Sequence, residues 1–120
     1  MKRFFRAKEI NDYENRKDGW VCGIISHYAD GVYLGQGNDI YKVDENTLCA
    51  FTGVSDKNHK HIYENDVICA TTKDGSRFYG NVIYSESDTA FVIDFKDVKM
   101  YLGVASKVYT LSVIGNTIDE

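Results

Sequence analysis

The residues that could do chemistry are concentrated in one short polar segment near the middle of the chain. His59 and His61 are two residues apart, so on a strand both imidazoles would share one face, and such a pair can begin a transition-metal site. The carboxylates of Asp56, Glu64 and Asp66 lie close to them in the sequence, and paired carboxylates can act as general acids and bases. A metal site or a catalytic site is therefore the first hypothesis to weigh.

Turn formation accounts for the same residues without any chemistry. The stretch Asp-Lys-Asn-His-Lys at 56–60 is typical of a tight turn, because Asn58 and His59 tolerate the positive φ that such turns need. Carboxylates beside turns commonly accept hydrogen bonds from turn N–H groups. The sequence also contains no nucleophile elbow and no glycine-rich phosphate loop. We therefore expect a non-enzymatic protein with no catalytic residues, no metal and no cofactor.

Three cysteines lie far apart at positions 22, 49 and 69. An odd number without a close pair fits neither a disulfide framework nor a zinc knuckle. Each has apolar neighbours, so we expect Cys22, Cys49 and Cys69 to be small buried hydrophobic residues in a reducing cytoplasm.

The charge balance argues against broad binding to nucleic acid. Fourteen Lys and Arg stand against eighteen Asp and Glu, which gives a net charge of −4 and an isoelectric point near 5.3. Nonspecific binding to nucleic acid needs a basic surface. A local basic stripe is the alternative, and it requires the N-terminal strand to lie beside the central turn. Its members would be Lys2, Arg3, Arg6, Lys57 and Lys60.

No part of the sequence indicates a membrane protein. Apolar runs stay well below the roughly 18 residues of a membrane span, and no apolar stretch follows the charged N-terminus as in a signal peptide. We expect no membrane association and a cytoplasmic location. The length of 120 residues suits one domain or two small lobes.

The segments that would position the central residues are short β-favouring runs. The runs 20–25 and 32–34 flank an Asp-Gly turn and predict a hairpin, and 39–43 alternates as a half-buried strand does. Helix evidence is confined to a single turn between 97 and 105. Further strands are predicted at 48–51, 66–71, 77–84, 89–95, 101–102 and 108–114.

Together these runs predict a mostly all-β protein with antiparallel sheets. We expect an N-terminal β lobe at 1–53, a connector turn motif at 54–66 and an SH3-like small barrel at 67–120. Gly80, inside a strong strand, predicts a bulge or a sharp bend of the kind that a small barrel needs at its corners. The two parts are expected to share one core, because about 50 residues per lobe is near the lower limit for independent stability.

The segment Phe51–Asp66 resembles the hallmark motif of the YopX family, whose members are encoded by bacteriophages and prophages. That motif joins Tyr/Phe-Thr-Gly-Leu, Asp-Lys-Asn-Gly-Lys and Ile-Tyr-Glu-Gly-Asp, and His59 and Asn65 stand here where the family usually has glycine. The start of the chain, Trp20-Val21 with Gly23, and a C-terminal Val-Ile-Gly-Asn extend the similarity. Matching positions of the central and C-terminal motifs are Phe51, Thr52, Gly53, Asp56, Lys57, Asn58, Ile62, Tyr63, Glu64, Asp66, Gly115 and Asn116.

The resemblance implies a mostly β fold and a phage or prophage protein in the cytoplasm of its bacterial host. It implies no established activity and no catalytic residues.

The N-terminus suggests how such a protein could act. Arg3, Phe4, Phe5 and Arg6 would form an edge strand, and unpaired edge amides invite pairing with another chain. The chain has no proline, which is one common guard of such edges. We therefore expect an accessory protein that acts by protein–protein interaction and self-assembly, as a homo-oligomer and with a host or phage protein as a possible partner. The alternative is a nucleic-acid-binding small β-barrel that uses the N-terminal basic residues.

Overall fold

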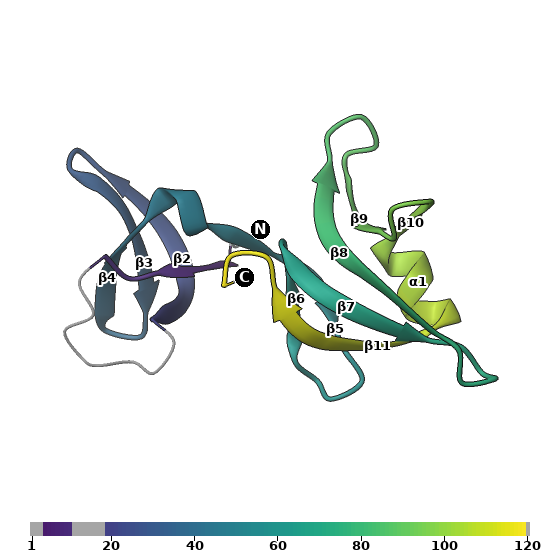
Figure 1. Cartoon of the computed structure of the whole chain (residues 1–120). Coiled ribbons are helices and arrows are strands. Elements are labelled where there is room, and N and C mark those ends of the chain that lie inside the picture. Colours follow the sequence, from purple (N-terminus) through teal and green to yellow (C-terminus); the bar gives the residue numbers. More distant parts are fainter. Residues whose placement is uncertain (1–3, 11–18, 120) are drawn as a thin grey trace. The chain divides into compact units, whose positions relative to one another are not determined.

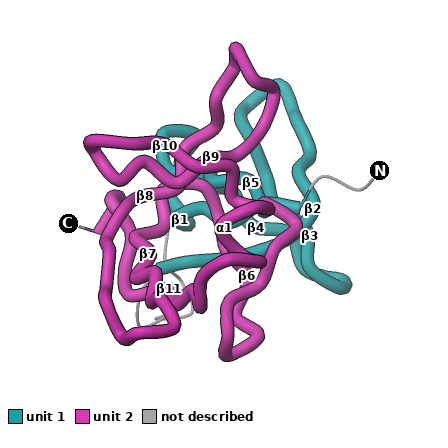
Figure 2. The backbone as a smooth tube through the Cα atoms, turned by 90° about the vertical axis from the view of Figure 1, so that its right-hand side faces the viewer, with its two compact units in different colours: residues 1–51 teal, residues 52–120 magenta. Residues whose placement is uncertain are grey.

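The computed structural model describes residues 4–10 and 19–119 (Figure 1). The chain divides into two compact units, Met1–Phe51 and Thr52–Glu120 (Figure 2). This division lies two residues before the predicted end of the N-terminal lobe, and it places the predicted connector at 54–66 inside unit 2. The described elements are strands except for one short α-helix and one 3-10 turn, which confirms a mostly all-β protein with antiparallel sheets.

Unit 1 is an antiparallel sheet in which tight hairpins join β2 to β3 and β3 to β4. The predicted hairpin is confirmed, with Tyr28 pairing Gly31 at its turn, and a 3-10 helix capped by the Asp44 side chain follows β4. The strands follow the order β4-β3-β2-β1-β5. Their bounds are β1 (Phe4–Lys8), β2 (Trp20–Tyr28), β3 (Gly31–Gln36), β4 (Asp39–Val43), η1 (Glu45–Thr47) and β5 (Cys49–Ser55).

Strand β1 is not a sheet edge, so the prediction for Phe4, Phe5 and Arg6 is wrong. Phe5 and Arg6 pair with β2 on one side and with Ala50 and Cys49 of β5 on the other. The N-terminal run alone could not reveal this, because the second partner strand begins more than forty residues later in the sequence. Arg3 lies outside the described residues.

Unit 2 contains a five-stranded antiparallel sheet in the order β10-β9-β8-β7-β11. Four consecutive strands form a meander, and the last strand returns beside the first after the helix, which is the SH3-like arrangement predicted. The sheet curls into a half-barrel, while β6 pairs with β5 at the start of the unit (Figure 1). The bounds are β6 (His61–Tyr63), β7 (Asp66–Thr71), β8 (Arg77–Ser85), β9 (Ala90–Asp94), β10 (Lys99–Tyr101), α1 (Leu102–Val108) and β11 (Thr110–Asn116).

Strand β8 is long and curved (Figure 1), and Gly80 lies near its middle. Residues up to Asn81 pair with β7, and residues from Asn81 onward pair with β9. A Cβ atom at position 80 would lie 2.7 Å from the Asp94 carbonyl oxygen and 2.7 Å from Ile93 Cγ2. Glycine is therefore required here because β9 approaches the backbone too closely for a side chain. The register irregularity of the sheet lies in β11 instead, between Val113 and Gly115.

Each unit has its own hydrophobic cluster, and the core that the two would share stays a prediction. The helix contributes Leu102 and Ala105 to the cluster of unit 2, and at seven residues it is longer than the single turn expected. The cluster of unit 1 contains Ala7, Val21, Val32, Leu34 and Val43. The cluster of unit 2 contains Ile62, Ile68, Ala70, Val82, Ile93, Leu102, Ala105 and Leu111.

Candidate functional site

The central segment forms the two turns that the sequence predicts. Asp56 N donates to Lys60 O at 2.8 Å and His59 N donates to Asp56 O at 3.0 Å, which closes the turn between β5 and β6. His59 has φ 64° and Asn65 has φ 72°. Both residues therefore adopt the left-handed backbone at the positions where the family usually has glycine.

The Asp56 carboxylate organises the first turn and also reaches the last strand. Its Oδ1 accepts from the backbone N–H groups of Asn58 (2.8 Å) and Lys60 (2.9 Å), and its Oδ2 accepts from Val113 N of β11 (3.0 Å). Beside it, Lys57 N donates to Leu111 O at 3.0 Å. These bonds occupy backbone groups along the open side of β11, so the turn closes the half-barrel at that strand.

Asp56 is only 7% exposed, and its surroundings favour the charged form. Burial by itself would raise the pKa of this carboxyl, but the N–H donors of Val113, Lys60 and Asn58, together with the Lys60 charge, lower that pKa below its ordinary value. An ionised carboxylate that already accepts three hydrogen bonds is suited to holding backbone, and it is poorly suited to exchanging protons with a substrate.

Asp66 has a similar task in the second turn. It is buried, and its Oδ2 accepts from Tyr63 N at 2.8 Å. Around it, Asn65 N donates to Val82 O and Thr117 N donates to Asn65 O, both at 2.8 Å. The predicted carboxylates thus serve separate turns, and Glu64 is only partly buried beside the second one.

The remaining residues of the resemblance also have structural positions. Thr52 Oγ1 donates to Ile62 O at 2.7 Å, and Ile62 is fully buried in the cluster of unit 2. Gly53 has φ 86°, which glycine adopts without strain. In unit 1 the Phe51 ring packs edge-on against Phe4, with centroids 6.2 Å apart.

At the C-terminal end of the resemblance, Gly115 follows the irregularity in β11. Asn116 Oδ1 accepts from Asp119 N at 2.8 Å, and its side-chain amide donates to the Asp119 carboxylate. These contacts finish the last strand.

The two histidines do not share a strand face. His59 lies in the turn, whereas His61 begins β6 and has its Nδ1 3.3 Å from Ser55 Oγ. Within residues 4–10 and 19–119, no group of three or more His, Cys, Asp or Glu side chains is placed to hold a metal ion. The three cysteines are free thiols; Cys49 and Cys69 are buried as predicted, and Cys22 is half-buried.

Arg6, one member of the basic stripe considered for nucleic-acid binding, is not exposed at the surface. This residue is 9% exposed, and its guanidinium lies 4.7 Å from the centroid of the Trp20 ring, which also has the Lys8 ammonium at 4.6 Å. Lys57 and Lys60 are exposed in unit 2, while Lys2 and Arg3 fall outside the described residues.

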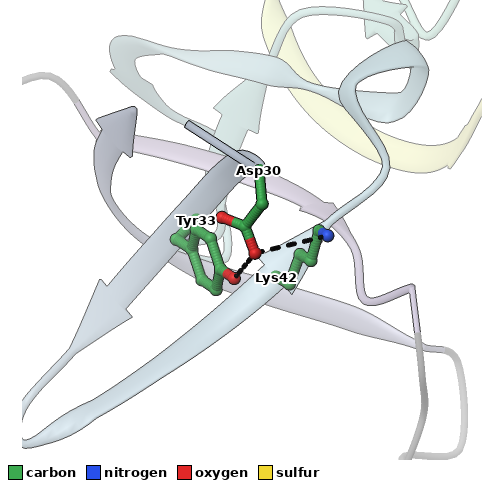
Figure 3. Close-up of polar contacts among 3 residues, drawn as sticks. All are labelled: Asp30, Tyr33 and Lys42. Atoms are coloured by element: carbon green, nitrogen blue, oxygen red, sulfur yellow. Dashed lines mark hydrogen bonds and ion pairs between the residues drawn. The ribbon is translucent and has the colours of Figure 1, made fainter. Parts of the chain in front are cut away.

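A polar cluster at the β2–β3 hairpin was not predicted (Figure 3). Tyr33 OH donates to Asp30 Oδ2 at 2.9 Å, and Lys42 Nζ lies 3.7 Å from the same oxygen. The hydrogen bond from Tyr33 lowers the pKa of Asp30 and raises that of Tyr33. Because Tyr33 becomes a weaker acid, it is poorly suited to catalysis. The cluster is better explained as a surface contact that links β3 and β4 through the Asp30 carboxylate. Asp30 is three residues before Tyr33 in the hairpin, and the register of β3 and β4 adds Lys42, which pairs with Tyr33.

The feature of unit 2 that most resembles a binding site is apolar and exposed. Val104 and Val108 are four residues apart in α1, so they share one face of the helix, and Tyr101 ends β10 directly before the helix. Phe78 lies beside the end of the helix, with its ring centroid 6.4 Å from that of Tyr109. We call Phe78, Tyr101, Val104 and Val108 the α1 surface; these side chains are between 47% and 55% exposed.

A shallow cleft of about 280 Å³ opens next to this helix, and Lys57, Ser106 and Tyr109 are among its lining residues. The sequence did not predict the α1 surface, because it indicated a single helical turn between 97 and 105 and assigned Val108 to a strand.

The comparison with family models decides the relationship. The model described as YopX protein matches residues 4–120. The chain belongs to the YopX family. The comparison with curated proteins found no match. Helix α1 of this YopX protein has seven residues. In the part of the chain that the structure describes, no helix is long and apolar enough to cross a membrane.

Proposed function

We propose that this YopX protein is a non-enzymatic accessory protein of a phage or prophage, located in the cytoplasm of the bacterial host. It acts by binding other proteins and by assembling with copies of itself. The phage context follows from the family resemblance, and the mode of action follows from the surface of unit 2.

The observation that carries the proposal is the α1 surface. Four large exposed apolar side chains on α1, β8 and the end of β10 are unusual for a surface that contacts only water, and contiguous exposed apolar patches commonly mark protein-binding sites. Binding through side chains replaces the strand pairing expected at the N-terminus, because β1 already has partners on both sides.

The hydrogen bonds that the Asp56 and Asp66 carboxylates accept support a non-enzymatic protein. Asp56 and Asp66 accept hydrogen bonds from turn N–H groups, and the pKa of Asp56 is lowered, whereas a general acid needs a pKa raised toward neutrality. The nucleic-acid alternative has less support, since the buried Arg6 stacks against Trp20 and is not presented to a phosphate backbone.

Sedimentation velocity from micromolar to near-millimolar concentration tests the proposal. We expect species heavier than the 13.6 kDa monomer, and we expect the double variant Val104→Ser, Val108→Ser to sediment as a smaller species. Ile40→Ser is the matched control, because Ile40 is equally exposed but belongs to unit 1.

A wild-type chain that remains monomeric throughout would contradict the self-assembly. A double variant that assembles as well as the wild type would show that the α1 surface is not the contact. For a host or phage partner, the same variants serve in a pulldown, and a specific partner must be retained by the wild type and Ile40→Ser but lost from the double variant.

A further inference from the structure

Strand β11 is the longest of the strands that end the two described sheets. It has seven residues, whereas the edge strands β6 and β10 have three each. Strand β4, the remaining edge, has five residues, and Ile10 N donates to Lys42 O near its end at 3.0 Å. Among the described strands, β11 therefore has the longest edge that another chain could pair with.

The sequence of β11 lacks the residues that commonly prevent edge strands from pairing. The stretch Thr-Leu-Ser-Val-Ile-Gly-Asn at 110–116 has no charged side chain and no proline, and Thr110, Val113 and Ile114 are β-branched. Short runs with high β propensity and little charge pair readily when they are exposed. The irregularity between Val113 and Gly115 interrupts the second half of the strand. The first half needs protection by another part of the fold.

The central turn covers this first half. We call residues 56–60 the guard turn. Lys57 N donates to Leu111 O and Asp56 Oδ2 accepts from Val113 N, both at 3.0 Å. Leu111 and Val113 are two residues apart, so these backbone groups lie on one side of β11, away from β7. They are the acceptor and the donor that a further strand would use.

A second β11 could make the same two hydrogen bonds as the guard turn. If two β11 strands run antiparallel with Ser112 opposite Ser112, Leu111 of each copy faces Val113 of the other. The second copy's Val113 N then donates to Leu111 O in place of Lys57 N, and its Leu111 O accepts from Val113 N in place of Asp56 Oδ2. Leucine lies opposite valine, so the apolar side chains stay on the side of the core cluster.

The guard turn contacts β11 mainly through polar groups. Residues 57–60 are exposed, and only Asp56 is buried. The cleft of about 280 Å³ described above is lined by residues 55–57 and by residues 109–111, so part of the space between the guard turn and the start of β11 is open. Loss of the Asp56 carboxylate should therefore uncover β11 without removing a member of the core cluster.

We propose that the guard turn keeps β11 closed, and that β11, once uncovered, pairs antiparallel with β11 of a second copy of this chain. The guard turn is an autoinhibitory contact, and it replaces the proline and the charged side chains that β11 lacks. The contact joins identical surfaces, so it has two-fold symmetry and closes at a dimer. It does not involve the α1 surface, and it does not depend on whether the intact protein assembles.

Sedimentation velocity of Asp56→Ala tests this pairing. The substitution is made in the Val104→Ser, Val108→Ser background, in which the α1 surface does not contribute. The guard turn then loses its bond to Val113 and the two bonds that shape it. We expect the Asp56→Ala variant to self-associate at least about tenfold more tightly than the background, because the edge of β11 becomes available.

A lysine in β11 shows whether the new association uses this strand. Adding Ser112→Lys to Asp56→Ala should return the association to that of the background, because two lysines then face each other across the two-fold axis. Ser87→Lys is the matched control, since it adds the same charge at an exposed serine in the β8–β9 turn and should change nothing.

Circular dichroism checks that each variant is folded. If Asp56→Ala is unfolded, Asp56→Asn replaces it, since asparagine keeps one oxygen for the turn while its NH₂ group cannot accept from Val113 N. If Ser112→Lys is unfolded, Thr110→Lys replaces it, because a lysine on an edge strand also opposes pairing.

The outcomes separate the edge pairing from the proposed function. A folded Asp56 variant that associates no more than its background contradicts the guard turn. Association that persists with the lysine in β11 contradicts β11 as the contact, and so does association that Ser87→Lys abolishes equally. A monomeric wild type overturns the self-assembly proposed above but leaves the pairing of the uncovered edge to be decided by the same variants.

Discussion

At the scale of single residues, Asp56 links the central turn to the last strand through three backbone hydrogen bonds. Asp56→Ala leaves these N–H groups without their acceptor, so we expect the free energy of unfolding to fall by about 2–4 kcal/mol. Asp56→Asn retains one oxygen and should lose less. Urea unfolding at pH 7 measures both changes, and Asp97→Ala, on an exposed loop, is the control.

The same side chain predicts how that loss depends on pH. The pKa of Asp56 in the folded protein lies below the ordinary value of 3.8, so its contribution is fully present above about pH 4 and disappears as pH falls through the lower, folded value. The difference in unfolding free energy between wild type and Asp56→Asn should therefore shrink on acidification. A difference that stays constant down to pH 2 would show that the charge of Asp56 does not contribute.

The backbone of the two turns was predictable at this scale, whereas the partners of the turns were not. Asn and His are residue types that tolerate positive φ, so the sequence correctly indicated turns at His59 and Asn65. Nothing near Asp56 in the sequence points to Val113, which lies 57 residues away. Residue types near Asp56 predict the turn, but only the fold shows that the turn is hydrogen-bonded to β11.

At the scale of elements, the close approach of β9 to β8 depends on the absence of a side chain at Gly80. Gly80→Ala would bring a Cβ within 2.7 Å of the β9 backbone, so we expect a loss of about 1–3 kcal/mol in unfolding free energy. Gly103→Ala is the matched control in α1, where a Cβ would have nothing within 4 Å and alanine favours helix by about 1 kcal/mol. Thermal melting should thus move in opposite directions for the two variants. Equal shifts would refute the close approach at Gly80.

Elements were predictable where the period or the turn residues were distinct. The hairpin of β2 and β3 follows from its Asp-Gly turn, and the strands from β7 to β9 follow from their β-branched and aromatic runs. The status of β1 as an inner strand was not predictable, because an edge strand and an inner strand of five residues have the same local sequence pattern. The sequence predicted only a single turn where helix α1 has seven residues, because seven residues contain barely two helical periods.

At the scale of the whole molecule, the two hydrophobic clusters predict two separable responses to core damage. Leu34 is fully buried in unit 1 and Ile93 is fully buried in unit 2. Leu34→Ala, which should cost about 2–5 kcal/mol, is expected to speed amide exchange in β2–β4 more than in β7–β9, and Ile93→Ala should do the reverse. Hydrogen exchange followed by mass spectrometry measures both patterns.

Uniform acceleration across the chain in both variants would contradict separate clusters and would favour the single cooperative core that the sequence predicted. Val98→Ala, at an exposed loop position, should leave exchange in both units unchanged and controls for nonspecific effects.

The hydrogen bonds of Asp56 and Lys57 to β11 also constrain the order of events during synthesis. Strands β7 to β10 leave the ribosome before β11. Until β11 is synthesised, one side of β7 has no partner strand, and the turn at Asp56 lacks its hydrogen bonds to Val113 and Leu111. Contacts between residues so distant in sequence form slowly, because a long loop must close first. Unit 2 therefore matures only after translation has passed its last strand, and a nascent chain stalled before β11 presents the open strand edge that the finished protein hides.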